Sequence, residues 1–179
     1  MRVIGGKNKG KKLKSFEGDA IRPTSDRARE SLFNILAPRL LDCDFLDLCC
    51  GTGAVGIEAI SRNAKSVTFV DSSKDSAKIA EFNLKSIGSD IKVNLMDAKR
   101  FVLQTQNTYD IIFFDPPYAY ADFEEIIKSV KERKLLKDGG LFIYEHKSDK
   151  PSIEIKGYIL KDSRKYGIAV FDFYKEGEV

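Results

Sequence analysis

A glycine-rich loop between an expected strand and an expected helix is the feature that most constrains the fold of this chain. The apolar run Phe45–Leu48 is followed by the letters CCGTGAVG and then by a helical pattern. Glycines in such a turn accept positive φ angles and let the backbone approach a ligand over the N-terminus of the helix. The loop therefore predicts a site for a dinucleotide or another adenosine-bearing cofactor.

Short apolar strands alternate with helical segments from this point on. The expected strands are Phe45–Leu48, Ser66–Val70, Ile91–Leu95, Ile111–Phe114 and Leu141–Tyr144, and the expected helices lie near Val55–Arg62, Lys74–Ile87 and Phe123–Leu135. This alternation is typical of an α/β fold with a doubly wound, mostly parallel sheet and right-handed crossovers. Tyr158–Lys161 and Ile168–Tyr174 leave no room for a crossover helix, so they predict a C-terminal antiparallel hairpin.

Composition narrows the class of protein. A chain of 179 residues with 42% hydrophobic residues is expected to form one domain with a sizeable core. Adjacent Cys49 and Cys50 make paired disulfides implausible and indicate a reducing, cytosolic compartment, so we interpret the three cysteines as small buried fillers. One histidine and no CxxC spacing argue against a metal site. We expect neither a secretory leader nor a membrane span.

The net charge of +3 is unevenly distributed. Residues 1–40 hold ten basic and four acidic residues, whereas residues 41–179 hold twenty and twenty-three. A basic terminus is often only a solvated tail. Clustered Lys and Arg also supply the sequence-independent part of nucleic-acid affinity, which favours an arm that holds phosphates. The candidate RNA-binding residues are Arg2, Lys7, Lys9, Lys11, Lys12, Arg22 and Arg27.

The segment RPTSDRARESLFNIL reads as the start of a helix. Thr24 or Ser25 is the expected N-cap, and Asp26 in the first turn suits the helix dipole. We expect Pro38 to close the helix. One apolar face is predicted to comprise Ala28, Leu32, Phe33, Ile35 and Leu36.

Two acids are candidates for holding the cofactor. Asp71, at the end of the second strand, has the spacing from Gly51 of an acid that accepts hydrogen bonds from ribose hydroxyls. The glycines do not separate NAD from S-adenosylmethionine. Asp47, in the strand that leads into the loop, is placed to receive the amino group of a methionine moiety and favours S-adenosylmethionine.

The string Asp115-Pro116-Pro117-Tyr118 follows the fourth strand, where open α/β sheets place their ligands. An exocyclic amine of a base is a poor nucleophile, so an enzyme must orient it. Asp115 and the carbonyl of Pro116 can each accept one of its N–H groups. Pro117 stiffens the turn, and Tyr118 offers a face on which the base can stack.

The motifs together resemble a known family. Asp47–Gly56 is similar to the cofactor loop of class I S-adenosylmethionine-dependent methyltransferases, and Asp115–Tyr118 to the [D/N]PP[Y/F] signature of those that methylate amino nitrogens. RVIGGKNKGKKL, RPTSDRARESLFN, IEAISRNA and the late KYG resemble the RsmD family. That resemblance implies a Rossmann-like, seven-stranded fold and methylation of a guanine N2 in small-subunit (16S) ribosomal RNA.

The resemblance also implies roles for single residues. Gly51 and Gly53 would line the methionine side of the cofactor, Asp71 would hold the ribose, and Asp97 with Ala98 would contact the adenine edge. Thr52 and Ser72 are further candidates for binding the cofactor. Residues 1–40 would form an RNA-facing arm and helix on a methyltransferase domain of residues 41–179. The implied partner is ribosomal RNA or a partly assembled small subunit, with no obligate protein partner.

Three alternatives stay open. The signature Asp115–Tyr118 does not identify the ring, so an enzyme that methylates adenine N6 in DNA, or acts on tRNA, is possible. An NAD-dependent oxidoreductase would use the same glycine loop. A non-catalytic RNA-binding assembly factor would keep the fold and the basic arm and transfer no methyl group.

Overall fold

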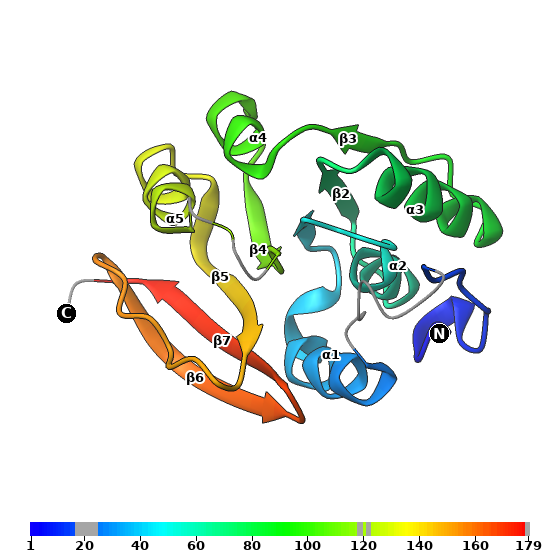
Figure 1. Cartoon of the computed structure of the whole chain (residues 1–179), viewed down its shortest axis with the longest axis horizontal. Coiled ribbons are helices and arrows are strands. Elements are labelled where there is room, and N and C mark those ends of the chain that lie inside the picture. Colours follow the sequence, from blue (N-terminus) through cyan, green and yellow to red (C-terminus); the bar gives the residue numbers. More distant parts are fainter. Residues whose placement is uncertain (17–24, 118–119, 121–122, 178–179) are drawn as a thin grey trace.

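A twisted seven-stranded sheet crosses the molecule in the computed structural model, which describes residues 1–16, 25–117, 120 and 123–177 (Figure 1). The strands are β1 (Asp44–Leu48), β2 (Ser66–Asp71), β3 (Val93–Leu95), β4 (Tyr109–Phe114), β5 (Leu136–Lys147), β6 (Tyr158–Tyr166) and β7 (Ala169–Glu176). Their order is β3-β2-β1-β4-β5-β7-β6. Strands β1 to β5 pair in parallel, and β7 is antiparallel to both of its neighbours. The expected doubly wound sheet and C-terminal hairpin are confirmed.

Helices cover both faces of this sheet. They are α1 (Asp26–Leu40), α2 (Ala54–Ser61), α3 (Lys74–Ser86), α4 (Ala98–Gln104) and α5 (Phe123–Glu132), and a 3-10 turn, η1, spans Gly6–Asn8. Helices α1 to α3 share one hydrophobic cluster with the sheet, and α4 and α5 share the other. Among these helices none is long and apolar enough to cross a membrane in the part of the chain that the structure describes.

Helix α1 departs from the sequence prediction at its C-terminal end. Ser25 caps it by accepting a hydrogen bond from the Ala28 N–H at 3.2 Å, whereas Thr24 lies outside the described residues. Pro38 does not close the helix, which continues to Leu40. A proline this close to the end removes only one backbone hydrogen bond, and burial of Leu40 stabilises the last turn. Ile35 is exposed instead of joining the apolar face.

Two strands are longer than the apolar runs that predicted them. Strand β5 begins at Leu136, because Lys137 reaches Asp44 and Asp110 at 2.6 and 2.8 Å and so satisfies a polar start. Strand β6 lies at the edge of the sheet and tolerates the polar run up to Tyr166. Helix α4 was not predicted. It is only seven residues long and its signal is the N-cap Asp97, which accepts N–H groups of the first turn.

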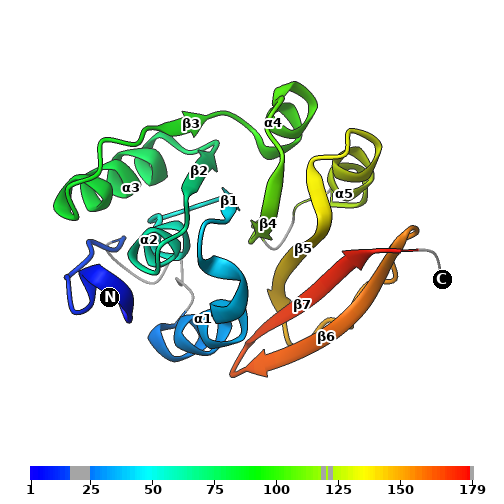
Figure 2. The same cartoon turned by 180° about the vertical axis from the view of Figure 1, so that it is seen from behind.

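The N-terminal segment packs against the body of the molecule. Residues 1–14 fold back on themselves through an Arg2–Lys12 bridge and lie beside α2 (Figure 2). Glu58 of α2 is fully buried and accepts hydrogen bonds from the N–H groups of Ile4 and Gly5 at 2.8 and 2.7 Å. Val3 and Leu13 are buried in the same cluster as α1 to α3.

A buried ion pair joins β5 to the hairpin. His146 Nε2 lies 3.0 Å from Asp172 Oδ2, and the same carboxylate accepts hydrogen bonds from the hydroxyls of Ser152, Ser163 and Tyr174. The hydrogen bond to Asp172 raises the pKa of His146 above its usual value, although burial opposes the shift. Burial alone would raise the pKa of Asp172, but its hydrogen bonds with His146 and the serines hold that pKa below the ordinary value.

Candidate active site

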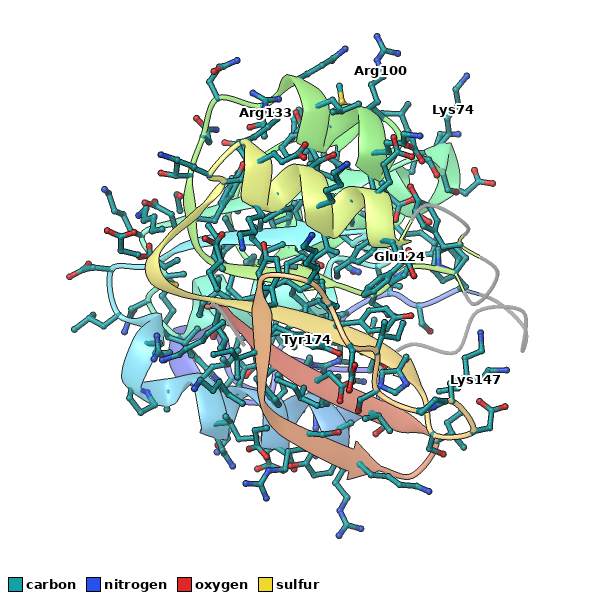
Figure 3. All side chains as sticks on the ribbon, turned by 90° about the vertical axis from the view of Figure 1, so that its left-hand side faces the viewer. Lys74, Arg100, Glu124, Arg133, Lys147 and Tyr174 are labelled. Atoms are coloured by element: carbon teal, nitrogen blue, oxygen red, sulfur yellow. The ribbon has the colours of Figure 1, made fainter. Side chains whose placement is uncertain are left out.

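A cavity of about 370 Å³ opens at the carboxyl ends of the central strands. Figure 3 shows Lys74 at the start of α3, Glu124 in the first turn of α5 and Lys147 at the end of β5 along one side of the molecule. The described residues that line the cavity are Cys49, Gly51, Val70, Asp71, Ser72, Ser73, Ser76, Asp97, Ala98, Asp115, Pro116, Pro117 and Tyr120. Two motifs widely separated in sequence, the glycine loop and the Asp-Pro-Pro turn, therefore share one cavity.

The glycine loop combines positive φ angles with a backbone that is open on one side at Gly51. Cys49, Gly51 and Gly53 have φ angles of 69°, 54° and 75°. A Cβ at Gly51 would have no atom within 4 Å, because the space beside it belongs to the cavity. At Gly53 a Cβ would lie 3.2 Å from Ala80 of α3, so this glycine permits helix packing. Gly51 is thus the position where the backbone is open to a ligand.

Asp71 supports the loop from the end of β2. Its Oδ2 accepts the Gly51 N–H and its Oδ1 accepts the Ser73 N–H, both at 2.8 Å. Each carboxylate oxygen has a second lone pair that can accept a further hydrogen bond, and Asp71 lines the cavity. The same side chain can therefore shape the loop and accept hydrogen bonds from a ligand.

Three residues predicted to hold the cofactor, Asp47, Thr52 and Gly53, are not among the described residues that line the cavity. Asp47 is 1% exposed, and its Oδ2 accepts the Gly56 N–H at 2.8 Å. Burial raises its pKa to about 7, and the nearby charges of Asp71 and Glu145 act in the same direction. Thr52 is buried, and its carbonyl accepts a hydrogen bond from Asn83 of α3. With Gly53, these residues stay predictions as cofactor contacts.

Tyr120 is a cavity residue that the sequence analysis missed. Its hydroxyl donates to Asp97 Oδ2 at 2.9 Å, and its ring packs edge-on against Phe114 at 5.8 Å. Asp97 uses its other oxygen to cap α4. The sequence signal was the second aromatic of the run PPYAY. Cys49 was also missed, since it lines the cavity instead of filling the core, while Cys43 and Cys50 are buried.

Asp115 and Pro116 follow directly after β4 and line the same cavity as Cys49 and Gly51 of the glycine loop. The Asp115 N–H lies 3.4 Å from the Leu48 carbonyl of β1, so the extended backbone continues past the strand. Burial of the carboxyl raises the pKa of Asp115 well above its ordinary value, and the charges of Glu145 and Asp47 add to the shift. Tyr118, predicted to stack on the base, lies outside the described residues.

The charges on the cavity wall discriminate between cofactors. Asp71, Asp97 and Asp115 line it, and no Lys, Arg or His is among the described lining residues. A pyrophosphate bridge would meet repulsion here, whereas a sulfonium and an ammonium group would be attracted. Together with the open backbone at Gly51, this wall fits S-adenosylmethionine.

The reversed strand β7, the glycine loop after β1 and the acid at the end of β2 define a class I methyltransferase, whose cofactor is S-adenosylmethionine. The family model described as "conserved hypothetical protein 95" matches residues 1–175. The chain belongs to this family, the RsmD family, as its motifs suggested.

Named relatives cover nearly the whole chain. It is 33% identical over 180 residues to ribosomal RNA small subunit methyltransferase D of Haemophilus influenzae, an alignment that covers 98% of this chain and 93% of the relative. It is 31% identical to the putative rRNA methyltransferase YlbH of Bacillus subtilis, over 98% of this chain and 99% of that protein. The solved structure of the putative methyltransferase yhhF from Escherichia coli superposes with a TM-score of 0.86 at 29% identity and covers 100% and 98% of the two chains.

Proposed function

We propose that this protein transfers a methyl group from S-adenosylmethionine to the exocyclic N2 of a guanine in small-subunit ribosomal RNA. The observation that carries the proposal is that Asp115 and Pro116 share one cavity with Gly51 and Asp71. A base amine held by the first pair would face a cofactor held by the second. The names of the relatives support ribosomal RNA as the substrate.

Asp115 and Pro116 would orient the amine. The carboxylate accepts one N2–H and the Pro116 carbonyl accepts the other, which turns the nitrogen lone pair towards the cofactor. When bound, S-adenosylmethionine supplies the methyl group from its sulfonium, so the N–CH₃ bond forms as the S–CH₃ bond breaks. The raised pKa of Asp115 also suits it to take the proton that the methylated, cationic amine must lose. Water can then receive that proton.

The basic N-terminal segment would bear on the RNA, as the RNA-facing part of residues 1–40. Arg2, Lys7, Lys9, Lys11, Lys12 and Arg27 are all exposed, and Arg22 lies outside the described residues. Because Glu58 and Asn83 hold the backbone of this segment, its charges are presented from a fixed surface. Arg29 is fully buried against Asp26 and Glu58, so it would serve the fold and not RNA.

The site argues against two of the alternative functions and does not separate the third from the proposal. The acidic cavity wall disfavours the NAD-dependent oxidoreductase. A non-catalytic assembly factor would have no need to hold Asp115 and the glycine loop in one cavity. Methylation of adenine N6, in DNA or in tRNA, would use the same two acceptors, the Asp115 carboxylate and the Pro116 carbonyl. Only identification of the methylated product separates this reaction from methylation of guanine N2. A ribosomal RNA substrate implies a cytoplasmic enzyme and requires no obligate protein partner.

The decisive experiment incubates the protein with labelled S-adenosylmethionine and either unmodified small subunits or naked small-subunit RNA. Nucleoside mass spectrometry then identifies the product, and mapping locates the nucleotide. N2-methylguanosine is expected. Label on adenosine would overturn the guanine assignment, and no transfer to either substrate would favour the assembly factor.

The matched variant is Asp115→Ala. It is expected to abolish transfer while calorimetric titration still detects S-adenosylmethionine binding, and a parallel titration with NAD should show none. Full activity of Asp115→Ala would exclude the proposed site. Lys11→Glu with Lys12→Glu is expected to weaken RNA binding and to reduce its dependence on salt.

A further inference from the structure

The register of the sheet brings Glu145 beside Asp115. Strands β4 and β5 are parallel, with Phe113 opposite Ile143 and Phe114 opposite Tyr144. One step further along the two strands, Asp115 lies opposite Glu145. Both Phe113 and Ile143 belong to the cluster under α1 to α3. Because side chains alternate along a strand, Asp115 and Glu145 project to that same face.

The charge interaction between the two residues agrees with this placement. Glu145 is the charged neighbour with the largest effect on Asp115, and Asp47 on the adjacent strand β1 is the next. His146 faces the opposite side of the sheet, where it pairs with Asp172. Glu145 is only partly exposed and lies on β5, one strand away from β4, which leads into the cavity-lining Asp115.

An aromatic side chain flanks Glu145 on the side away from Asp115. Glu145 pairs with Phe171 of β7, and the ring of Tyr166 lies 5.8 Å from that of Phe171. Tyr166 belongs to the KYG motif, for which the catalytic scheme has no use. Arg164, two residues before Tyr166 and also opposite Phe171, is held by Asp162 at 2.7 Å. Glu145 thus lies between Asp115 on one side and the aromatic residues of the hairpin on the other.

The hydrogen-bonding groups of guanine and adenine differ at the atoms that the carboxylates of Asp115 and Glu145 could contact. Guanine presents three neighbouring N–H donors, two on N2 and one on N1, whereas N1 of adenine is an acceptor. Asp115 and Pro116 account for the two hydrogens of N2. Neighbouring strands are about 4.8 Å apart, a spacing that lets two carboxylates address adjacent atoms of one base edge. An ionised carboxylate accepts hydrogen bonds and cannot donate them.

We infer that Glu145 accepts the N1–H of the target guanine and thereby selects guanine over adenine. The inference rests on the proposed function and deepens it, because it names the residue that reads the base. Two neighbouring carboxylates repel each other in the free protein, and a donor-rich base edge relieves that repulsion. An adenine would instead place its N1 lone pair against a carboxylate.

The test compares guanine with 2-aminopurine at the mapped target nucleotide of an otherwise identical RNA substrate. 2-Aminopurine keeps the N2 amine but has an acceptor at N1. The wild type is expected to methylate guanine at least about 10-fold more efficiently by kcat/KM. Glu145→Gln should lower kcat/KM for guanine by about 10- to 100-fold and raise that for 2-aminopurine relative to guanine, since the glutamine amide can donate to N1.

The controls separate reading of the base from a structural role. Glu145→Ala should lose the discrimination without the relative gain on 2-aminopurine. Glu154→Gln, the same change at an exposed position, should leave both substrates unaffected. S-adenosylmethionine affinity should match the wild type in all three variants, and their Tm should not fall below that of the wild type, since loss of Glu145 removes a repulsion.

An unchanged ratio between the two substrates in Glu145→Gln would overturn the inference, whether or not total activity falls. Equal wild-type rates on guanine and 2-aminopurine would also overturn it, and that result does not depend on the folding of any variant. If the wild type instead methylates a base other than guanine, it is the proposed function that fails.

Discussion

The hydroxyl of Tyr120 donates a hydrogen bond to Asp97 at 2.9 Å, and both residues line the candidate cofactor cavity. Tyr120 follows the Asp-Pro-Pro turn and Asp97 caps α4, so this bond joins the part of the cavity that would hold the base to the part that would hold adenine. The backbone N–H of Tyr120 also donates to the Pro117 carbonyl at 2.9 Å, which shapes the turn itself.

Replacing Tyr120 by Phe removes this bond and keeps the ring packing on Phe114. The affinity for S-adenosylmethionine is expected to fall by about 5-fold, since one hydrogen bond contributes about 1 kcal/mol. Isothermal titration calorimetry checks this value. Tyr109→Phe is the control, because its hydroxyl contacts Thr68 on another part of the sheet. Equal affinities of Tyr120→Phe and the wild type would mean that the bond does not order the cavity.

Activity should depend on the ionisation of Asp115. The carboxyl must be ionised to accept the amine N–H, and its pKa lies above the ordinary value because of burial and the charges of Glu145 and Asp47. As the pH falls through that raised pKa, kcat/KM should drop, with a midpoint above the value of about 3.9 for a free aspartate. Glu145→Gln removes one like charge and should move the midpoint to lower pH. A profile that stays flat to about pH 5 would contradict this assignment.

Two glycines of the loop should respond in opposite ways to alanine. A Cβ at Gly56 would lie 2.3 Å from the Phe69 ring and 3.0 Å from Asp47 Oδ2, so Gly56→Ala should lower the free energy of unfolding by about 3 kcal/mol. At Gly51 the added methyl would enter the open cavity at a φ of 54°, with backbone strain of about 1 kcal/mol. Gly51→Ala should therefore lose cofactor affinity more than stability. Urea unfolding and calorimetry on both variants measure the two effects.

The buried pair of His146 and Asp172 should contribute strongly to stability. Asp172→Asn leaves His146 without its charged partner and is expected to cost about 3 to 5 kcal/mol in urea unfolding. The folded pKa of His146 is raised, so its contribution is complete below the unfolded pKa of about 6.5 and is lost as the pH rises through the folded pKa. That pH dependence should be weaker in the variant. Asp162→Asn, which breaks the surface pair with Arg164, should cost no more than about 1 kcal/mol.

The parts of the site that sequence could predict are those made by neighbouring residues. The glycine loop, the Asp-Pro-Pro turn and Asp71 each follow a strand directly, and the carboxyl ends of parallel strands meet at one edge of the sheet. The resemblance to a family extended this to Asp97 and Ala98, which the cavity also includes.

The parts that could not be predicted depend on partners far apart in the chain. Asp47 lies in the expected strand, but its side chain points towards α2, where it accepts the Gly56 N–H and is buried. Glu58 reads as an ordinary surface residue of a helix until the N-terminal backbone is placed against it. The partner of His146 is 26 residues away on a strand that runs in the opposite direction.

The hydrogen bonds that hold the N-terminal segment against α2 and α3 also constrain the order in which parts of this protein can fold. Lys14 donates its N–H to Asn83 Oδ1 at 2.7 Å and accepts from the same amide at 3.0 Å, while Glu58 holds Ile4 and Gly5. During synthesis, the first fourteen residues therefore leave the ribosome well before the surfaces that receive them. Until α2 and α3 have emerged, Val3 and Leu13 lack their core and the basic charges are unconfined. Residues 1–14 can therefore dock only after the chain has been made as far as α3.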